Sequence, residues 1–144
     1  MSNDATDRPV TILPESECWQ LLSSTPIGRL VTAADGIPEI FPINFAVQDR
    51  TVLFRTAEGA KLVTSAINKE VLFEADEYGA DEGWSVIVKG VTRSLRTDEE
   101  IEEAERAHLR PWTKTIKDHY IRVLPTRVSG RRFCFSRDGE VSPQ

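Results

Sequence analysis

Two cations and a hydroxyl lie where a strand is predicted to turn into a helix. Arg55 and Thr56 end an apolar run, Gly59 permits a turn, and Lys61 falls in the first turn of a helix predicted over 60–68. The free N–H groups and the dipole of a helix start attract anions. A lysine opposes that dipole, so a bound anion would explain its presence. The alternative is that Arg55 and Lys61 are solvated surface charges.

A proline interrupts a second apolar run, Phe41-Pro42-Ile43-Asn44-Phe45. Proline cannot donate a ladder hydrogen bond, so this run is predicted to be an edge strand or a distorted one. The backbone groups beside Pro42 would then be free to bind a flat heteroaromatic ring with amide-like edges. The alternative is an ordinary edge strand without a ligand.

The other candidate residues carry weaker signals. Trp84, which precedes Ser85, and Trp112 could stack on a flat ring, although tryptophan more often fills a core or a subunit interface. His108 and His119 have no partner at metal-ligand spacing, and we interpret them as surface or capping residues. We find no nucleophile motif, P-loop or dinucleotide-binding glycine motif, so we name no catalytic residue and no metal ligand.

The composition is that of one ordinary globular domain, with 144 residues of which 40% are hydrophobic and 28% charged. Cys18 and Cys134 are far apart and form no zinc motif. The net charge of −5 argues against nucleic acid, although bases outnumber acids after Arg106. No apolar run is long enough for a membrane span, and the N-terminus has no signal-peptide layout. We therefore expect a cytoplasmic protein.

Short β-rich runs between turn signals predict an antiparallel sheet with short helices between its strands. The predicted strands are 28–33, 39–47, 51–56, 71–76, 84–95, 119–124 and, after a turn at Ser129-Gly130, 128–135. The predicted helices are 14–24, 60–68 and 97–109. Asp35-Gly36 predicts a tight turn, Gly90 a bulge, and Thr97 with Glu100 a capping box. Because short turns exclude parallel crossovers and a closed sheet has no exposed edges, we predict a small antiparallel barrel capped by helices.

In this order the motifs resemble the pyridoxamine 5'-phosphate oxidase-like superfamily of flavin-binding split β-barrels, especially its short actinobacterial and nitroimidazole-resistance-type members. The segments that carry the resemblance are Gly28-Arg-Leu-Val-Thr32, Pro42-Ile-Asn-Phe45, Phe54-Arg-Thr56, Gly59-Ala-Lys61, Gly83-Trp-Ser-Val86, Lys89-Gly90 and Gly130-Arg-Arg132. The resemblance implies a mainly β (α+β) fold: a six- to seven-stranded antiparallel split barrel with flanking short helices. It also implies a homodimer with two flavin sites at the subunit interface. The domain would span 14–136, between a flexible arm (1–13) and a tail (137–144).

The resemblance also assigns residues to the cofactor. Those that match the grip on the cofactor phosphate are Arg55, Thr56 and Lys61, and those that match the segment beside the isoalloxazine ring are Pro42, Ile43 and Asn44. Trp84 and Ser85 match a segment near the ring or the phosphate. Trp112 and Arg131 match residues that reach in from the partner subunit.

The function implied is that of an FMN-binding oxidoreductase that acts on an unknown small organic substrate. Gly130-Arg-Arg-Phe133 does not reproduce the Arg-x-His-Arg segment of true pyridoxamine phosphate oxidases, which argues against oxidation of vitamin B6. Two alternatives stay open: a reductase that uses the deazaflavin coenzyme F-420, and a flavin- or haem-binding protein without turnover. We expect no nucleic-acid or membrane partner.

Overall fold

The computed structural model describes residues 9–57, 69–109 and 118–135, which form seven strands and two helices. In chain order these elements are β1 (Val10–Ile12), α1 (Glu15–Leu22), β2 (Ile27–Ala34), β3 (Ile37–Gln48), β4 (Thr51–Ala57), β5 (Glu70–Tyr78), β6 (Glu82–Ser94), α3 (Asp98–Glu105) and β7 (Asp118–Cys134). The helix predicted over 60–68 lies outside the described residues.

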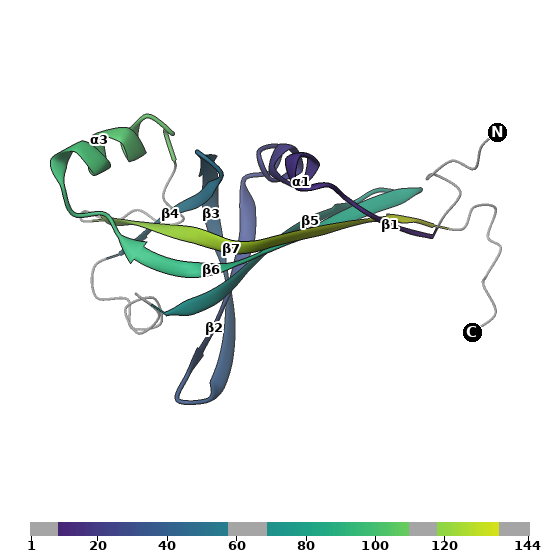
Figure 1. Cartoon of the computed structure of the whole chain (residues 1–144), viewed down its shortest axis with the longest axis horizontal. Coiled ribbons are helices and arrows are strands. Elements are labelled where there is room, and N and C mark those ends of the chain that lie inside the picture. Colours follow the sequence, from purple (N-terminus) through teal and green to yellow (C-terminus); the bar gives the residue numbers. More distant parts are fainter. Residues whose placement is uncertain (1–8, 58–68, 110–117, 136–144) are drawn as a thin grey trace.

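Six of the strands close into an antiparallel barrel. Neighbouring strands follow the order β7-β4-β3-β2-β5-β6, and β6 pairs back onto β7, so the sheet has no open side between them. β1 adds to β7 outside this ring. Figure 1 shows the β2–β3 hairpin projecting away from the side where the two helices lie. The predicted mainly β split barrel is confirmed.

The barrel interior is the main hydrophobic core. Side chains alternate between the two faces of each strand, and the inward-facing Phe54, Phe73 and Val86 are completely buried. Helix α1 closes one side of this core with Cys18, Trp19 and Leu22. The helix predicted over 14–24 is therefore confirmed.

Helix α3 covers part of the outer face of the barrel. Leu53, which is fully buried on the outside of β4, packs with Leu95, Ala104 and Leu109 in a second apolar cluster. The predicted capping box is present, since the Thr97 hydroxyl accepts from the Glu100 N–H at 3.1 Å and the Glu100 carboxylate accepts from the Thr97 N–H at 3.1 Å. Neither described helix is long and apolar enough to cross a membrane.

The predicted turn at Ser129-Gly130 is wrong, because β7 runs without interruption through both residues. Gly130 serves close packing instead of a turn: a Cβ there would lie 2.6 Å from the Cys18 sulfur and 3.2 Å from a methyl group of Val86. The two predicted C-terminal strands are therefore one strand of 17 residues. The sequence analysis also missed β1, which lies within the segment expected to be a flexible arm.

The bulge predicted at Gly90 is confirmed by a register shift between Lys89 and Gly90 in the β6–β7 ladder. At this point the backbone of β7 comes close to β6. A Cβ on Gly90 would overlap the carbonyl oxygen of Leu124, a backbone atom that cannot rotate away. The glycine thus permits the close approach that bends the two longest strands around the core.

Gly90→Ala should therefore destabilise the fold by about 1–3 kcal/mol, the usual cost of forcing an extra carbon into a packed site. The measurement is the denaturant midpoint of unfolding. Gly79→Ala is the matched control, because a Cβ at Gly79 meets nothing closer than 3.7 Å. Equal stability of the two variants would contradict this role for Gly90.

Candidate functional site

The ladder between β3 and β4 stops halfway along β3. The strand pairs run from Gln48↔Thr51 to Phe45↔Phe54 and end there, although β4 continues to pair with β7 as far as Ala57. Among the described residues, β3 has β2 as its only strand neighbour from Ile37 to Asn44. Within the part of the chain that the structure describes, the β3–β4 ladder therefore ends at Phe45, and one edge of β3 beyond it is not paired with a strand.

The prediction that Pro42 marks an edge strand is confirmed at this opening. The Phe45 N–H donates to the Pro26 carbonyl on the β2 side, and successive peptide groups of a strand point to opposite sides. The nitrogens of Pro38 and Pro42 therefore face the open edge, where proline leaves no N–H unpaired. The N–H groups of Ile40 and Asn44 point the same way.

Asn44 and Arg55 are the residues next to the last ladder pair, Phe45↔Phe54, and the alternation of strand side chains places both on the outer face of the barrel. The Arg55 Nη1 donates to the Leu109 carbonyl at 2.9 Å, and its guanidinium lies 5.3 Å from the centre of the Tyr120 ring. A cation over an aromatic face is attracted to it. These contacts hold the guanidinium in place beside the opening.

The structure thus brings part of the predicted phosphate and ring site together. Pro42, Asn44 and Arg55 share the outer face, whereas the Ile43 side chain is in the main core, so only its backbone can meet a ligand. Thr56 is half-buried at the end of β4. Lys61 and Trp112 lie outside the described residues.

Trp84, Ser85 and Arg131 do not join that site within one chain. Trp84 packs in the main core, while Ser85 lies on β6, which β2 and β5 separate from β3. Arg131 is exposed on β7 and pairs with Ser85 across the ladder. A single ligand could contact both groups only if one of them came from a second copy of the chain or if the ligand reached across two strands.

An ionic cluster that the sequence analysis missed surrounds Ser85. Arg29 contacts two carboxylates, Glu74 at 2.9 Å and Asp76 at 3.3 Å, and the Ser85 hydroxyl donates to Glu74 at 3.1 Å. Burial raises the pKa of Glu74 to about 7, and the hydrogen bond and charge of Asp76 add to the rise, which Ser85 and Arg29 oppose. Nothing in the sequence could show this cluster without the pairing of β2, β5 and β6.

Apolar side chains surround this cluster on the same outer face. Ile27, Ile40, Leu72 and Ile87 are each between 39% and 63% exposed, which is unusual for isoleucine and leucine. Beside them lies a groove of about 300 Å³, lined by Val31, Thr32, Ala33, Pro38, Glu70, Val71, Leu72 and Lys89. The outward-facing side chains of β2, β5 and β6 form what we call the β2–β5–β6 face, with Pro38 and Ile40 of β3 at its margin.

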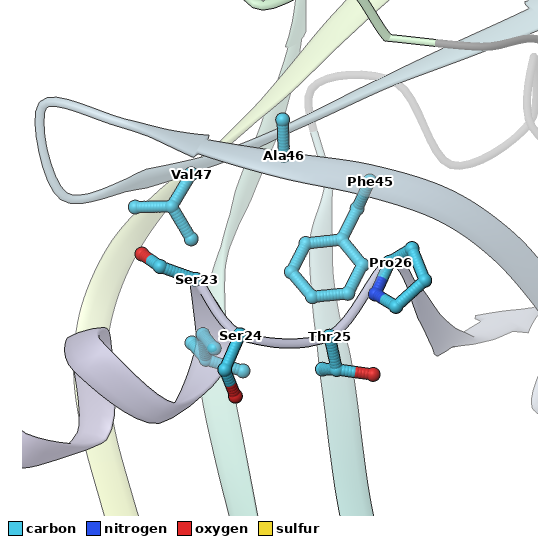
Figure 2. Close-up of a pocket in the computed structure, with 8 residues that line it drawn as sticks. Ser23, Ser24, Thr25, Pro26, Phe45, Ala46 and Val47 are labelled. Carbon is cyan, nitrogen blue, oxygen red and sulfur yellow. The ribbon is translucent and has the colours of Figure 1, made fainter.

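A second cavity, of about 370 Å³, lies between the end of α1 and β3 (Figure 2). Phe45 and Val47 point into it from β3, while Ala46 points away. The hydroxyls of Ser23 and Ser24 are already donated to the Trp19 and Leu21 carbonyls. The cavity is therefore lined by both polar and apolar groups, and it lies beside the strand segment that follows Asn44.

No group of three His, Cys, Asp or Glu side chains within 9–57, 69–109 and 118–135 is arranged to hold a metal ion. The chemistry available at the opening is instead that of a fixed cation, an amide side chain and backbone groups on an unpaired strand edge. Such donors suit a ligand that combines an anionic group with a flat polar ring.

Comparison with known proteins gives the family. The family model described as pyridoxamine 5'-phosphate oxidase matches residues 14–132. Uncharacterized protein Rv3129 of Mycobacterium tuberculosis is 53% identical over 96 residues, which is 67% of this chain and 87% of that protein.

Two solved structures share both sequence and fold with the chain. The FAD binding protein from Mycobacterium smegmatis has a TM-score of 0.82 and 60% identity, covering 88% of this chain and all of that one (100%). An FAD-binding protein from Mesorhizobium loti has a TM-score of 0.74 and 27% identity, covering 85% of this chain and 96% of that one. With its fold and most of its length matched, the chain belongs to the pyridoxamine 5'-phosphate oxidase family.

Proposed function

We propose that this protein binds a flavin nucleotide at the opening between β3 and β4 and uses it in an oxidoreductase reaction on a small organic substrate. The observation that carries the proposal is the pairing of an open strand edge with a fixed cation at Asn44 and Arg55. The flavin supplies the hydride or electron chemistry when bound, and the protein supplies binding and orientation.

The residues at the opening fit the two ends of a flavin. The ring presents an edge of alternating acceptors and donors, which can bind the N–H of Asn44, its side-chain amide and neighbouring carbonyls. The phosphate is an anion, which the Arg55 guanidinium can bind by charge-assisted hydrogen bonds. Thr56, and Lys61 beyond the described residues, are proposed to complete this grip.

FAD is the first candidate for the flavin, because the 60% identical protein from M. smegmatis is named as an FAD binding protein. FMN, which the sequence resemblance implied, and the deazaflavin are the other two candidates. Competitive titration with all three distinguishes them. A carrier without turnover would bind its flavin equally well, so reduction by NAD(P)H and reoxidation by a panel of acceptors tests the oxidoreductase assignment.

We propose further that the protein is a homodimer whose subunits meet on the β2–β5–β6 face. This face carries both projecting apolar side chains and a groove, so two copies related by a twofold axis can each fill the groove of the other. Dimerisation would also bring Ser85 and Arg131 of one copy toward the flavin site of the other. Contacts of this kind would explain why one chain alone does not assemble all the predicted positions.

Arg55→Ala should weaken flavin binding roughly ten- to hundredfold, because a hydrogen bond to a charged group contributes about 1.5–3 kcal/mol. Binding is measured by quenching of flavin fluorescence. Arg50→Ala is the control, since Arg50 is an exposed cation on the β3–β4 turn that contacts Glu15 only at 3.9 Å. Unfolding midpoints of both variants show whether the fold is intact, and unchanged affinity in a folded Arg55→Ala variant would remove the phosphate assignment.

Ile40→Asp should convert the dimer to a monomer in sedimentation experiments, because it places a charge beside Val31, which lines the groove of the proposed interface. Ile40 is 63% exposed in the single chain, so the substitution should cost the fold little. Ile40→Val is the matched control, because it keeps an uncharged apolar side chain at the same position, and it should remain a dimer. Dimers that persist in Ile40→Asp would exclude this face as the interface.

A further inference from the structure

The charges on the β2–β5–β6 face do not balance. In the cluster formed by Arg29, Glu74 and Asp76, one cation contacts two carboxylates. All three side chains lie on the outward-facing side of their strands. Glu74 and Asp76 are only 23% and 21% exposed, whereas Arg29 is 47% exposed. When both carboxyl groups are ionised, the cluster therefore carries one excess negative charge on two acids that are largely shielded from water.

The groups that surround Glu74 offer no other compensation. Arg29 faces it from β2 and Asp76 shares its strand, while β6 contributes Ser85 and the apolar Ile87, its direct partner in the ladder. Lys89 lies one side-chain position further along β6, opposite Leu72, and Arg131 lies beyond Ser85 on β7. The nearest side chains are thus one cation, one acid, one hydroxyl and apolar groups.

Covering this face with protein removes the water that solvates the excess charge. Burying an uncompensated carboxylate costs several kcal/mol, and two copies related by a twofold axis bring two such clusters into one interface. The least costly response is for each cluster to bind a proton, which the two carboxyl groups that Arg29 brings together can share.

We propose that association of two copies through the β2–β5–β6 face takes up one proton at each Glu74–Asp76 pair, so that the dimer is tighter in mildly acidic than in alkaline solution. This inference rests on the homodimer proposed above. In this inference, protonation of an acidic pair that lies among apolar residues regulates the affinity of the dimer.

The direction of the pH dependence of dimer affinity follows from the pKa of Glu74. Burial has already raised this pKa to about 7 in the single chain, and loss of the remaining water in the dimer raises it further. A group with the higher pKa in the associated state binds protons on association. Dimer stability is then fully present below about pH 7 and is lost as the pH rises through the pKa of the dimer. With two protons per dimer, the dissociation constant rises by up to about 100-fold per pH unit in that window.

The test is sedimentation equilibrium of the full chain with excess FAD at pH 6.5 and 8.5. The wild-type dissociation constant should be at least tenfold larger at pH 8.5. Glu74→Gln, which keeps the shape and removes the charge, should bind tightly at both pH values, and Asp76→Asn should also flatten the dependence. Glu77→Gln is the control, an exposed acid on the same strand outside the cluster, and it should behave like wild type.

The outcomes separate this inference from the proposal beneath it. If the chain is a monomer at every pH and concentration, the homodimer itself falls, and the proton linkage falls with it. If the dimer forms but its affinity is independent of pH, or increases as the pH rises, only the proton linkage is overturned. An increase with pH would mean that cations of the partner copy meet the ionised carboxylates. A pH dependence that persists unchanged in Glu74→Gln would place the titrating group elsewhere.

Discussion

Hydrogen bonding between two adjacent strands stops at Phe45 and Phe54, and the rest of the arrangement depends on this interruption. β4 keeps its pairing with β7, and β3 keeps its pairing with β2. The barrel therefore stays closed and stable around an opening in a single ladder. Strand edges normally attract other strands, and the placement of Pro38 and Pro42 toward the opening reduces that hazard while leaving a few backbone groups free for a ligand.

The position of Arg55 beside this opening is set by contacts with other elements. Arg55 is held by the Leu109 carbonyl and the Tyr120 ring, and α3 packs on Leu53 just beyond it. A cation whose position is set by the fold loses little conformational freedom when it binds an anion. The site therefore follows from the way α3 and β7 hold the end of β4.

The sequence predicts local features whose cause is local. Asp35-Gly36 adopts positive φ angles of 54° and 77°, as a two-residue hairpin turn requires, and the Thr97 capping box and the Gly90 bulge are present. Sequence-based prediction fails where the role of a residue depends on contacts with distant parts of the chain. Ser129-Gly130 has the composition of a turn, but a glycine is needed at position 130 because the side chains of Cys18 and Val86 leave no room for a Cβ. β1 is only three residues long and exists because β7 offers it an edge.

The same distinction applies to the site. Pro42 and Arg55 of the candidate site are visible in the sequence as a proline in an apolar run and a cation at the end of a strand, whereas Asn44 came from the family resemblance. The Arg29–Glu74–Asp76 cluster could not, because it depends on the register of β2 against β5, which no short segment encodes. Likewise, strand alternation predicts that the Ile43 side chain is buried only after the structure shows which face of β3 points into the barrel.

The most direct test of the central claim is a crystal structure of the protein grown with FAD. The account predicts the flavin ring against the open edge of β3 at Pro42–Asn44 and a phosphate on Arg55. A flavin bound elsewhere, or an opening that the partner subunit fills with its own side chains, would contradict it.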